Sequence, residues 1–510
     1  MSASMTNNKR IAKNTMILYI RMGITMLVQL YTSRVVLQAL GVTDYGIYNI
    51  VGTVVVMFSF ISNPLNTATQ RFYNYELGRS DISQLNRVFN MSFYIFCILA
   101  SVMFLLVEIT GSWYVLNKMN MPAERISSAM FAFQFSLIAF LFSLLRTPFE
   151  SMIVAYERMS FFAYISILEV VLKLANAFSL LYYGFDKLIL FTFNQLVITI
   201  ICFACIVIYS KRQFIAIKLH RIWDGSLFRQ LLSFTGWSLF GSVATMSADQ
   251  GVNIVINSFC GVAVNAAVGI ANQVSATINQ FVGNFQVAFR PQIVKLYANN
   301  EHDSLRKLIV SSAKYSYLLL FAIACPVIFN VNYLLNIWLG NVPQYAGEFV
   351  ILNIVYMLLE TVSAPLWMTI QATGKIKKYQ LIISSVLLLN IVFSIVMLKQ
   401  GLPPYAVLYA KCILDILCFI VRILYVRNHT DLSLRTFAKD VIIPVSVITV
   451  IGILVFYFML HIGMQEFTLL IFGSALFFVL YIPSILYLCV TKQDRTQLFY
   501  FIKNKINNFK

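Results

Sequence analysis

Apolar residues fill long stretches of this chain, and polar residues are concentrated in short breaks between them. A helix needs about 20 apolar residues to cross a membrane, whereas the strands of a membrane barrel show weak alternation over about 10 residues. The runs here have the helical length, and they predict about fourteen transmembrane helices. The expected spans are 15–38, 47–70, 88–109, 127–147, 160–182, 187–209, 231–257, 263–288, 309–330, 347–371, 380–398, 404–426, 440–460 and 467–490. We therefore expect an all-α polytopic membrane protein.

The composition agrees with this prediction. Apolar residues make up 59% of the 510 residues and charged residues only 11%, against about 45–50% and about 25% in soluble domains. So few charges exclude a soluble enzyme, a disordered scaffold and a secreted disulfide module. The eight cysteines fall in or at the ends of apolar runs, where we expect small packing residues.

The net charge of +18 could suggest nucleic acid as a partner, but the placement of the charges argues against it. With fourteen spans, only Lys118, Arg125, Lys187 and Lys399 fall in loops on one side of the membrane. The other loop cations, including those at both chain ends, fall on the opposite side. Because cytoplasmic loops carry the excess of Lys and Arg, both termini are predicted to be cytoplasmic.

A short pattern occurs in both halves of the chain. Residues 40–49 read LGVTDYGIYN, and residues 260–272 read CGVAVNAAVGIAN. Six predicted helices separate the copies, so the halves would be parallel repeats; chance similarity between apolar sequences is the alternative. We expect an N-terminal lobe (1–210), a cytoplasmic linker (211–230), a C-terminal lobe (231–426), and two further helices with a basic tail (427–510).

Polar side chains form stripes on four of the predicted helices, as the helical turn of about 100° per residue shows. One stripe alone could be interhelical hydrogen bonding, at about 0.6 kcal/mol per bond. Four stripes favour a shared, water-filled cavity. They comprise Arg21, Thr25, Gln29 and Thr32; Asn49, Ser59, Asn63, Asn66 and Gln70; Ser238, Ser242, Thr245, Asp249 and Asn253; and Asn265, Asn272, Asn279 and Gln286.

Ionisable residues at membrane depth are a sharper signal, because each costs about 2.5–3.5 kcal/mol at a helix centre. Arg21, Asp249 and Glu360 have no partner on their own predicted helix. They are the strongest candidates for function. A cation in the first lobe suits an anionic substrate, and carboxylates in the second suit a coupling cation, H⁺ or Na⁺.

For the other charged residues at membrane depth, a structural role is as good an interpretation as a functional one. Glu169–Lys173 and Lys411–Asp415 are spaced i,i+4, so each pair could be neutralised on its own helix. Arg34 lies near the end of its helix and could extend its charge to the membrane surface.

Motifs for other chemistry are missing. The chain has no Walker A sequence, HExxH, nucleophile elbow or paired CxxC. No cofactor is expected, and a carrier is favoured over an enzyme.

Several segments resemble one known family. They are Lys13-Asn14-Thr15, residues 33–37 (SRVVL), residues 40–49 with their counterpart 261–272, and Phe289-Arg290-Pro291-Gln292. The chain is similar to the polysaccharide transporters of the multidrug/oligosaccharidyl-lipid/polysaccharide (MOP) flippase superfamily, and most similar to bacterial O-antigen-type flippases.

This resemblance implies a MATE/MOP-like fold: two parallel six-helix lobes around a central cavity, plus two C-terminal helices. It implies a bacterial inner-membrane flippase that alternates between inward- and outward-open states. The implied cargo is a polyprenyl-diphosphate-linked oligosaccharide of an O-antigen, capsule or exopolysaccharide. The expected partners are this substrate, the phospholipid bilayer and a glycan polymerase machinery, with the chain itself a monomer.

Two sets of site residues follow from the stripes and this resemblance. In some relatives an acidic residue of the seventh helix helps to bind the coupling cation, and Asp249 is the matching position. A Na⁺ ion is considered there. The coupling set is Asp249, Asn253, Glu360 and Asp415. The substrate set is Arg21, Arg34, Thr25, Gln29, Asn49, Asn63, Asn66, Gln70, Lys173, Asn272 and Asn279.

Three alternatives stay open. A multidrug or cation antiporter of the same fold would need an acidic, aromatic cavity, which the Arg residues of the first helix argue against. A membrane-embedded glycan polymerase or acyltransferase would need a large external loop or a buried His, and the predicted loops are short. A scaffold would leave the charges at depth without a role.

Overall fold

Helices make up the regular structure of this chain. The computed structural model describes residues 2–57, 62–117, 121–180, 186–214, 218, 223–430, 432–462, 464–489 and 495. Every regular element within these residues is helical. The predicted all-α membrane architecture is therefore confirmed.

Ten helices in the described residues are long and apolar enough to cross a membrane. Four predicted spans are not among them: 47–70, 231–257, 263–288 and 404–426. The first contains residues 58–61, which lie outside the described part. The other three lie in the helices Gly225–Ala298 and Ala406–Arg427, which carry polar and charged residues along these spans. Those helices carry much of the candidate site described below.

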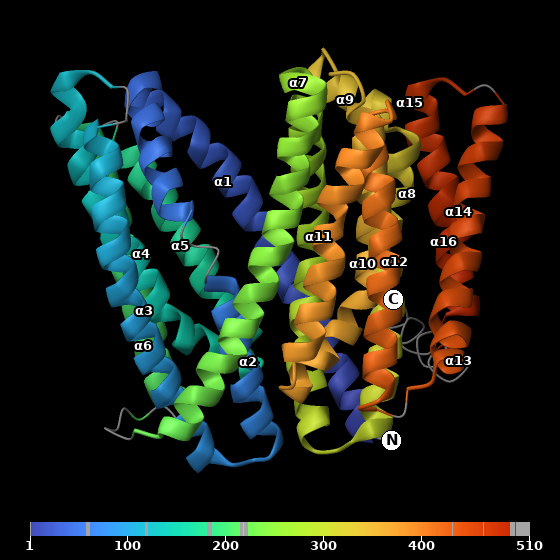
Figure 1. Cartoon of the computed structure of the whole chain (residues 1–510), viewed down its shortest axis with the longest axis horizontal. Helices are drawn as coiled ribbons and strands as arrows, with labels where there is room; N and C mark the ends of the chain where they lie inside the picture. The colour runs from blue at the N-terminus through green and yellow to red at the C-terminus, as the bar shows by residue number, and fades with distance from the viewer. Residues whose placement is uncertain are drawn as a thin grey trace, which may run out of the picture. The chain divides into compact units, whose positions relative to one another are not determined.

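The chain folds into two compact units. Unit 1 comprises Met1–Ser242, Val287–Glu301 and Gly374–Lys377. Its main helices are α1 (Ser2–Met57), α2 (Ser62–Gly78), α3 (Ile82–Asn117), η2 (Ala123–Arg125), α4 (Ile126–Ala155), α5 (Met159–Ser179) and α6 (Lys187–Gln213). Helix α4 packs against α6 and α3, and α1 packs against α5 (Figure 1).

Unit 2 comprises Val243–Gln286, His302–Thr373 and Lys378–Lys510. Its helices are α8 (His302–Phe329), α9 (Val331–Leu339), α10 (Ala346–Thr373), α11 (Lys377–Lys399), α12 (Ala406–Arg427), α13 (Leu434–Phe437), η3 (Ala438–Ile442), α14 (Ile443–His461), α15 (Glu466–Thr468), η4 (Leu469–Gly473) and α16 (Ser474–Leu488). Helix α10 packs against α12 and α8, and α14 packs against α16 (Figure 1). The short α9 was not predicted, because its nine residues cannot form a span.

Helix α7 (Gly225–Ala298) contributes to both units. Its first and last residues belong to unit 1, and residues 243–286 belong to unit 2. The last turns are held in unit 1 by the buried carboxylate of Glu157. Gln292 Nε2 donates to both oxygens of Glu157 at 2.8 Å, and Lys295 Nζ donates to Oε1 at 2.9 Å.

The two long helices α1 and α7 each contain one glycine with a non-helical backbone. Gly41 has φ 75° and ψ 172°, and Gly261 has φ 81° and ψ 179°. These are the glycines of the two similar segments in the sequence, and their conformations match. Positive φ with ψ near 180° is essentially restricted to glycine. The glycines separate 15–38 from 47–70 and 231–257 from 263–288, which were predicted as separate helices.

Arg125, just before α4, forms ion pairs with two other segments of unit 1: Asp44 of α1 and Asp186 at the start of α6. Arg125 Nη1 pairs with Asp186 at 2.6 Å, and Arg125 also forms an ion pair with Asp44. Asp186 caps the N-terminus of α6 by accepting from the backbone N–H groups of Leu188 and Ile189. Burial alone would raise the pKa of Asp186, but its hydrogen bonds from Ser128 and from α6, with the nearby Arg125, lower it.

Replacement of either non-helical glycine by alanine should destabilise the protein. We expect Gly41→Ala and Gly261→Ala each to lower the free energy of unfolding by about 1–3 kcal/mol, because alanine is strained in this conformation. Thermal unfolding of the purified protein in detergent would measure this loss. Gly23→Ala is the control, since Gly23 is helical and no atom lies within 4 Å of an added Cβ. Equal stability of Gly41→Ala and Gly23→Ala would contradict the prediction.

Candidate functional site

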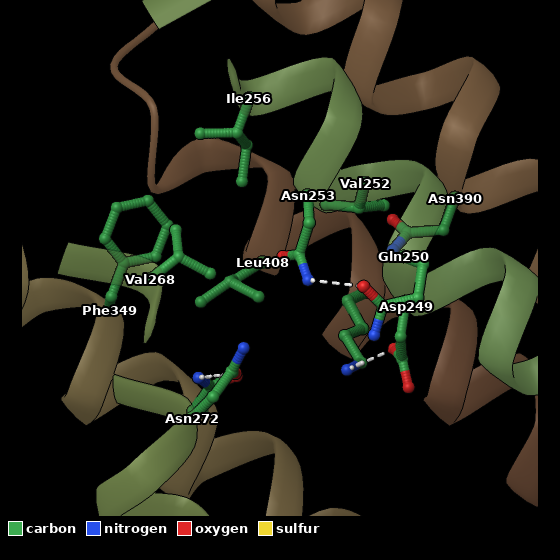
Figure 2. Close-up of a pocket in the computed structure, with 12 residues that line it drawn as sticks. Asp249, Gln250, Val252, Asn253, Ile256, Val268, Asn272, Phe349, Asn390 and Leu408 are labelled. Carbon is green, nitrogen blue, oxygen red and sulfur yellow. Dashed lines mark hydrogen bonds and ion pairs between the residues drawn. The ribbon is translucent and has the colours of Figure 1, made fainter. Parts of the chain in front are cut away.

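Unit 2 contains a pocket of about 200 Å³. Helices α7, α10, α11 and α12 supply its lining (Figure 2). The polar residues of the lining are Asp249, Gln250, Asn253, Asn272, Asn353, Asn390 and Lys411. The apolar ones are Val252, Ile256, Val268, Phe349 and Leu408. The pocket therefore combines amide groups, one acid, one base and an apolar wall.

The acid and the base of this pocket pair with each other. Lys411 Nζ lies 2.9 Å from Asp249 Oδ1 and 4.2 Å from the centre of the Tyr356 ring. Asp249 has no partner on its own helix, as predicted, but α12 supplies one. The expected pairing of Lys411 with Asp415 along α12 is wrong.

Asp415 instead belongs to a second charged cluster of unit 2. Arg422 Nη1 lies 2.9 Å from Glu360 Oε2 and 3.5 Å from Asp415 Oδ1. Arg422 Nε also donates to the Tyr379 hydroxyl at 3.3 Å. The side chains of Arg422 and Asp415 are buried, at 7% and 1% exposure. Two carboxylates thus share one guanidinium in this cluster, which leaves one uncompensated negative charge when both are ionised.

Unit 1 contains a charged network of the opposite sign. Arg146 lies between Glu150, whose Oε1 is 3.0 Å from Nε, and Glu169, whose Oε2 is 3.0 Å from Nη1. Lys173 Nζ pairs with Glu169 Oε1 at 2.7 Å, so the predicted i,i+4 pair is confirmed. Arg21 lies 4.9 Å above the Phe162 ring and interacts electrostatically with Glu150.

Among the described residues, three cations and two carboxylates make up this unit 1 network, a net charge of +1 when all are ionised. All five side chains are wholly or partly buried. An excess cation held among apolar helices attracts an anion more strongly than the same cation in water. The network can therefore hold an anionic group next to Arg21 or Lys173.

Other residues of the predicted substrate set have structural partners. Asn66 Oδ1 accepts from Gln70 Nε2 at 2.9 Å and from Ser151 Oγ of α4 at 2.7 Å. Thr25 Oγ1 donates to the backbone oxygen of Met22 at 3.1 Å. Asn66, Gln70 and Thr25 thus form interhelical or local hydrogen bonds in this structure.

The remaining predicted residues divide between pocket and surface. Asn253 and Asn272 line the unit 2 pocket, whereas Gln29, Arg34 and Asn279 are exposed. The side chains of Asn49 and Asn63 lie outside the described part. Within the described residues no group of three His, Cys, Asp or Glu side chains could hold a metal ion.

Sequence reasoning missed several residues of these sites. Asn353 and Asn390 each stand as polar residues in a long apolar run, and that isolation is the signal that could have found them. Arg146 and Arg422 lie near the ends of the predicted spans 127–147 and 404–426 and were counted with the cytoplasmic loop cations, but both lie inside helices and pair there.

Comparison with known proteins supports the fold. No protein-family model matches the chain, and no curated protein matches it significantly. Among solved structures, a multidrug resistance MATE family transporter of the MOP superfamily in an outward-facing conformation aligns with a TM-score of 0.70 and 14% identity, over 82% of this chain and 95% of that one.

Two further structures align similarly. A MOP superfamily transporter from Pyrococcus furiosus gives a TM-score of 0.69 at 14% identity, over 85% of this chain and 97% of that one. A MATE protein in complex with MaL6 gives 0.67 at 14% identity, over 82% and 96%. The chain thus has the fold of MATE and MOP superfamily transporters, which confirms the coarser part of the predicted resemblance.

The guanidinium of Arg422, which Glu360 and Asp415 share, leads to a testable prediction. Arg422→Met should lower the free energy of unfolding by about 3–5 kcal/mol, because it leaves two carboxylates close together without a cation. Thermal unfolding would measure the loss. Arg427→Met is the control: it removes an exposed cation from the same helix and should change stability by less than about 0.5 kcal/mol.

Adding Glu360→Gln and Asp415→Asn to Arg422→Met should restore most of the lost stability. Equal effects of Arg422→Met and Arg427→Met, or no recovery in the triple variant, would contradict the cluster.

Proposed function

We propose that this protein is a flippase that moves a polyprenyl-diphosphate-linked oligosaccharide from the cytoplasmic to the outer leaflet of a bacterial inner membrane. Transport would occur by alternating access. The excess positive charge of the unit 1 network carries this proposal. A diphosphate is the anionic part of such a cargo, and Arg and Lys bind phosphate oxygens through charge-assisted hydrogen bonds.

The paired acid of the unit 2 pocket supports the same choice over a multidrug antiporter. A cavity for cationic drugs would present an unpaired carboxylate, but Asp249 is paired with Lys411. The Pyrococcus furiosus transporter is described as having a binding pocket of reverse polarity that suggests a different function. Pocket polarity therefore helps to distinguish functions among proteins of this fold.

The physical problem for such a flippase is the headgroup. Moving a diphosphate and several sugars through hydrocarbon would require removal of their hydration without replacement, at a prohibitive cost. The cations of unit 1 would replace water around the phosphates, and amide groups would replace it around the hydroxyls. The polyprenyl tail would stay in the lipid throughout.

The proposal also covers the orientation of the protein in the membrane and its partners. Because the loop cations gather on one side, we propose that both termini are cytoplasmic. The phospholipid bilayer and a glycan polymerase machinery are the proposed partners, and the chain is proposed to act as a monomer without a catalytic residue.

For the coupling ion we propose H⁺ at Glu360 and Asp415. A Na⁺ ion at Asp249 would compete with the ammonium group of Lys411, which lies 2.9 Å away. At Glu360 and Asp415 a single proton would balance the charge of two carboxylates and one guanidinium. Binding of that proton in one state of the transporter and its release in the other would couple the flip to the proton gradient.

Arg21 offers a test of the anion site, because it belongs to the unit 1 network and is a candidate contact for the phosphates. In proteoliposomes with a fluorescent polyprenyl-diphosphate oligosaccharide, Arg21→Ala should lower the initial flipping rate at least about tenfold, the effect of losing one charge-assisted contact. Arg21→Lys keeps the charge and should retain most of the rate. Arg79→Ala removes an exposed cation and is the control.

Wild-type rates in Arg21→Ala would contradict the role of this cation. Export of organic cations by a wild-type protein that flips no lipid-linked glycan would instead identify a multidrug antiporter.

Asp415→Asn tests the proposed coupling. This variant removes one titrating carboxylate and keeps its shape, so flipping by the variant should no longer respond to an imposed pH gradient. Flipping down a gradient of labelled lipid should persist. Asp249→Asn should keep the response to the pH gradient, and a wild-type response to Na⁺ alone would contradict the assignment.

A further inference from the structure

Five amide side chains meet in the unit 2 pocket. Gln250 and Asn253 come from α7 before Gly261, and Asn272 comes from the same helix after it. Asn353 comes from α10 and Asn390 from α11. Each amide carries a donor and an acceptor, so the five can contact several hydroxyl groups at once.

These amides have hydrogen-bonding capacity to spare. Asn253 Nδ2 lies 3.5 Å from Gln250 Oε1, and Asn353 Nδ2 lies 3.5 Å from Asn272 Oδ1 (Figure 2). Both distances are well beyond the usual 2.9–3.0 Å, so these bonds are weak. Asn390 is 96% buried, and its Oδ1 has no hydrogen-bond partner. A buried carbonyl oxygen without a hydrogen bond costs about 1–3 kcal/mol of desolvation free energy. A ligand hydroxyl that donates to this oxygen would recover that cost.

The net charge of the pocket and its apolar lining residues restrict the class of ligand that can bind there. The ion pair Asp249–Lys411 is neutral as a whole, so the pocket presents no unpaired charge of its own among the described lining residues. Phe349, Val268 and Leu408 supply an apolar side (Figure 2). A sugar ring fits this combination, because its rim carries hydroxyl groups and its faces are formed by C–H groups.

The volume limits the ligand to a small group. Pockets for drug-sized ligands measure about 300–1,000 Å³, and this one measures about 200 Å³. It would hold about seven water molecules at about 30 Å³ each. That space suits a single ring better than a polycyclic drug.

We propose that the unit 2 pocket binds one uncharged pyranose residue of the cargo. Asn353 and Asn390 would bond its hydroxyl groups, and Phe349 would cover one face of the ring. This inference rests on the proposed function and extends it, because it names the class of sugar that the unit 2 pocket would select.

Binding of simple glycosides would test the pocket directly. The full-length protein in lipid nanodiscs would be titrated with the methyl glycosides of glucose, galactose and N-acetylglucosamine, followed by saturation-transfer NMR. At least one glycoside should bind. Asn353→Leu and Asn390→Leu each remove an amide at nearly constant volume and should weaken that binding at least about tenfold.

Asn336→Leu is the matched control, because Asn336 is an exposed Asn of α9 that does not line the pocket. It should bind the glycoside like wild type. Thermal unfolding of each variant would show that the fold is kept; a variant that fails to fold would be replaced by Asn353→Ala or Asn390→Ala. Absence of glycoside binding to wild type, or equal binding by Asn390→Leu, Asn353→Leu and wild type, would overturn the proposal.

A second readout distinguishes this inference from the proposed function. If wild type flips no lipid-linked oligosaccharide but binds a glycoside that Asn390→Leu does not, the sugar site stands and the flippase proposal fails. If wild type flips the lipid, and Asn353→Leu and Asn390→Leu flip lipids with different sugars at wild-type rates, the sugar site fails and the flippase stands. Displacement of the glycoside by tetraphenylphosphonium would identify a drug pocket and overturn the proposal.

Discussion

The cost of placing charge in hydrocarbon constrains this structure more than any other factor. The candidate membrane-spanning segments and α12 carry ionisable side chains that could not stay there without partners. The structure meets this cost by joining charges from different helices, as Lys411 of α12 does with Asp249 of α7 and Arg146 of α4 with Glu169 of α5. Breaking the partly buried pair Arg146–Glu169 would leave a charge without compensation between α4 and α5.

The two large clusters differ in how their charges balance. The unit 1 network has one cation more than it has carboxylates, and the cluster around Arg422 has one carboxylate more than it has cations. Each imbalance can be relieved by a ligand of the opposite charge. An anionic headgroup fits the unit 1 network, and a proton fits the cluster around Arg422. The amide-lined pocket of unit 2, which has no net charge, suits an uncharged sugar. These three sites are the basis of the proposed flippase function.

Much of the fold could be predicted from the sequence, because a buried membrane helix requires a continuous apolar run. The predicted spans 127–147 and 187–209, for example, lie within α4 and α6. The similar segments around Gly41 and Gly261 also have the same backbone conformation. The pairing of charges could not be predicted: spacing along one helix found Glu169–Lys173, but it missed Lys411–Asp249, whose partners are far apart in the chain. Stripe analysis likewise missed Asn390, which is the one polar residue within the apolar stretch 386–393 of α11.

The position of the diphosphate tests the central claim most directly. A cryo-electron microscopy structure of the protein with a bound polyprenyl-diphosphate oligosaccharide would show it. The account predicts that the phosphate density lies within hydrogen-bonding distance of Arg21 or Lys173, with a sugar ring against Asn353 and Asn390. Phosphate density away from both cations, or an organic cation rather than a glycolipid bound at the amide pocket, would contradict it.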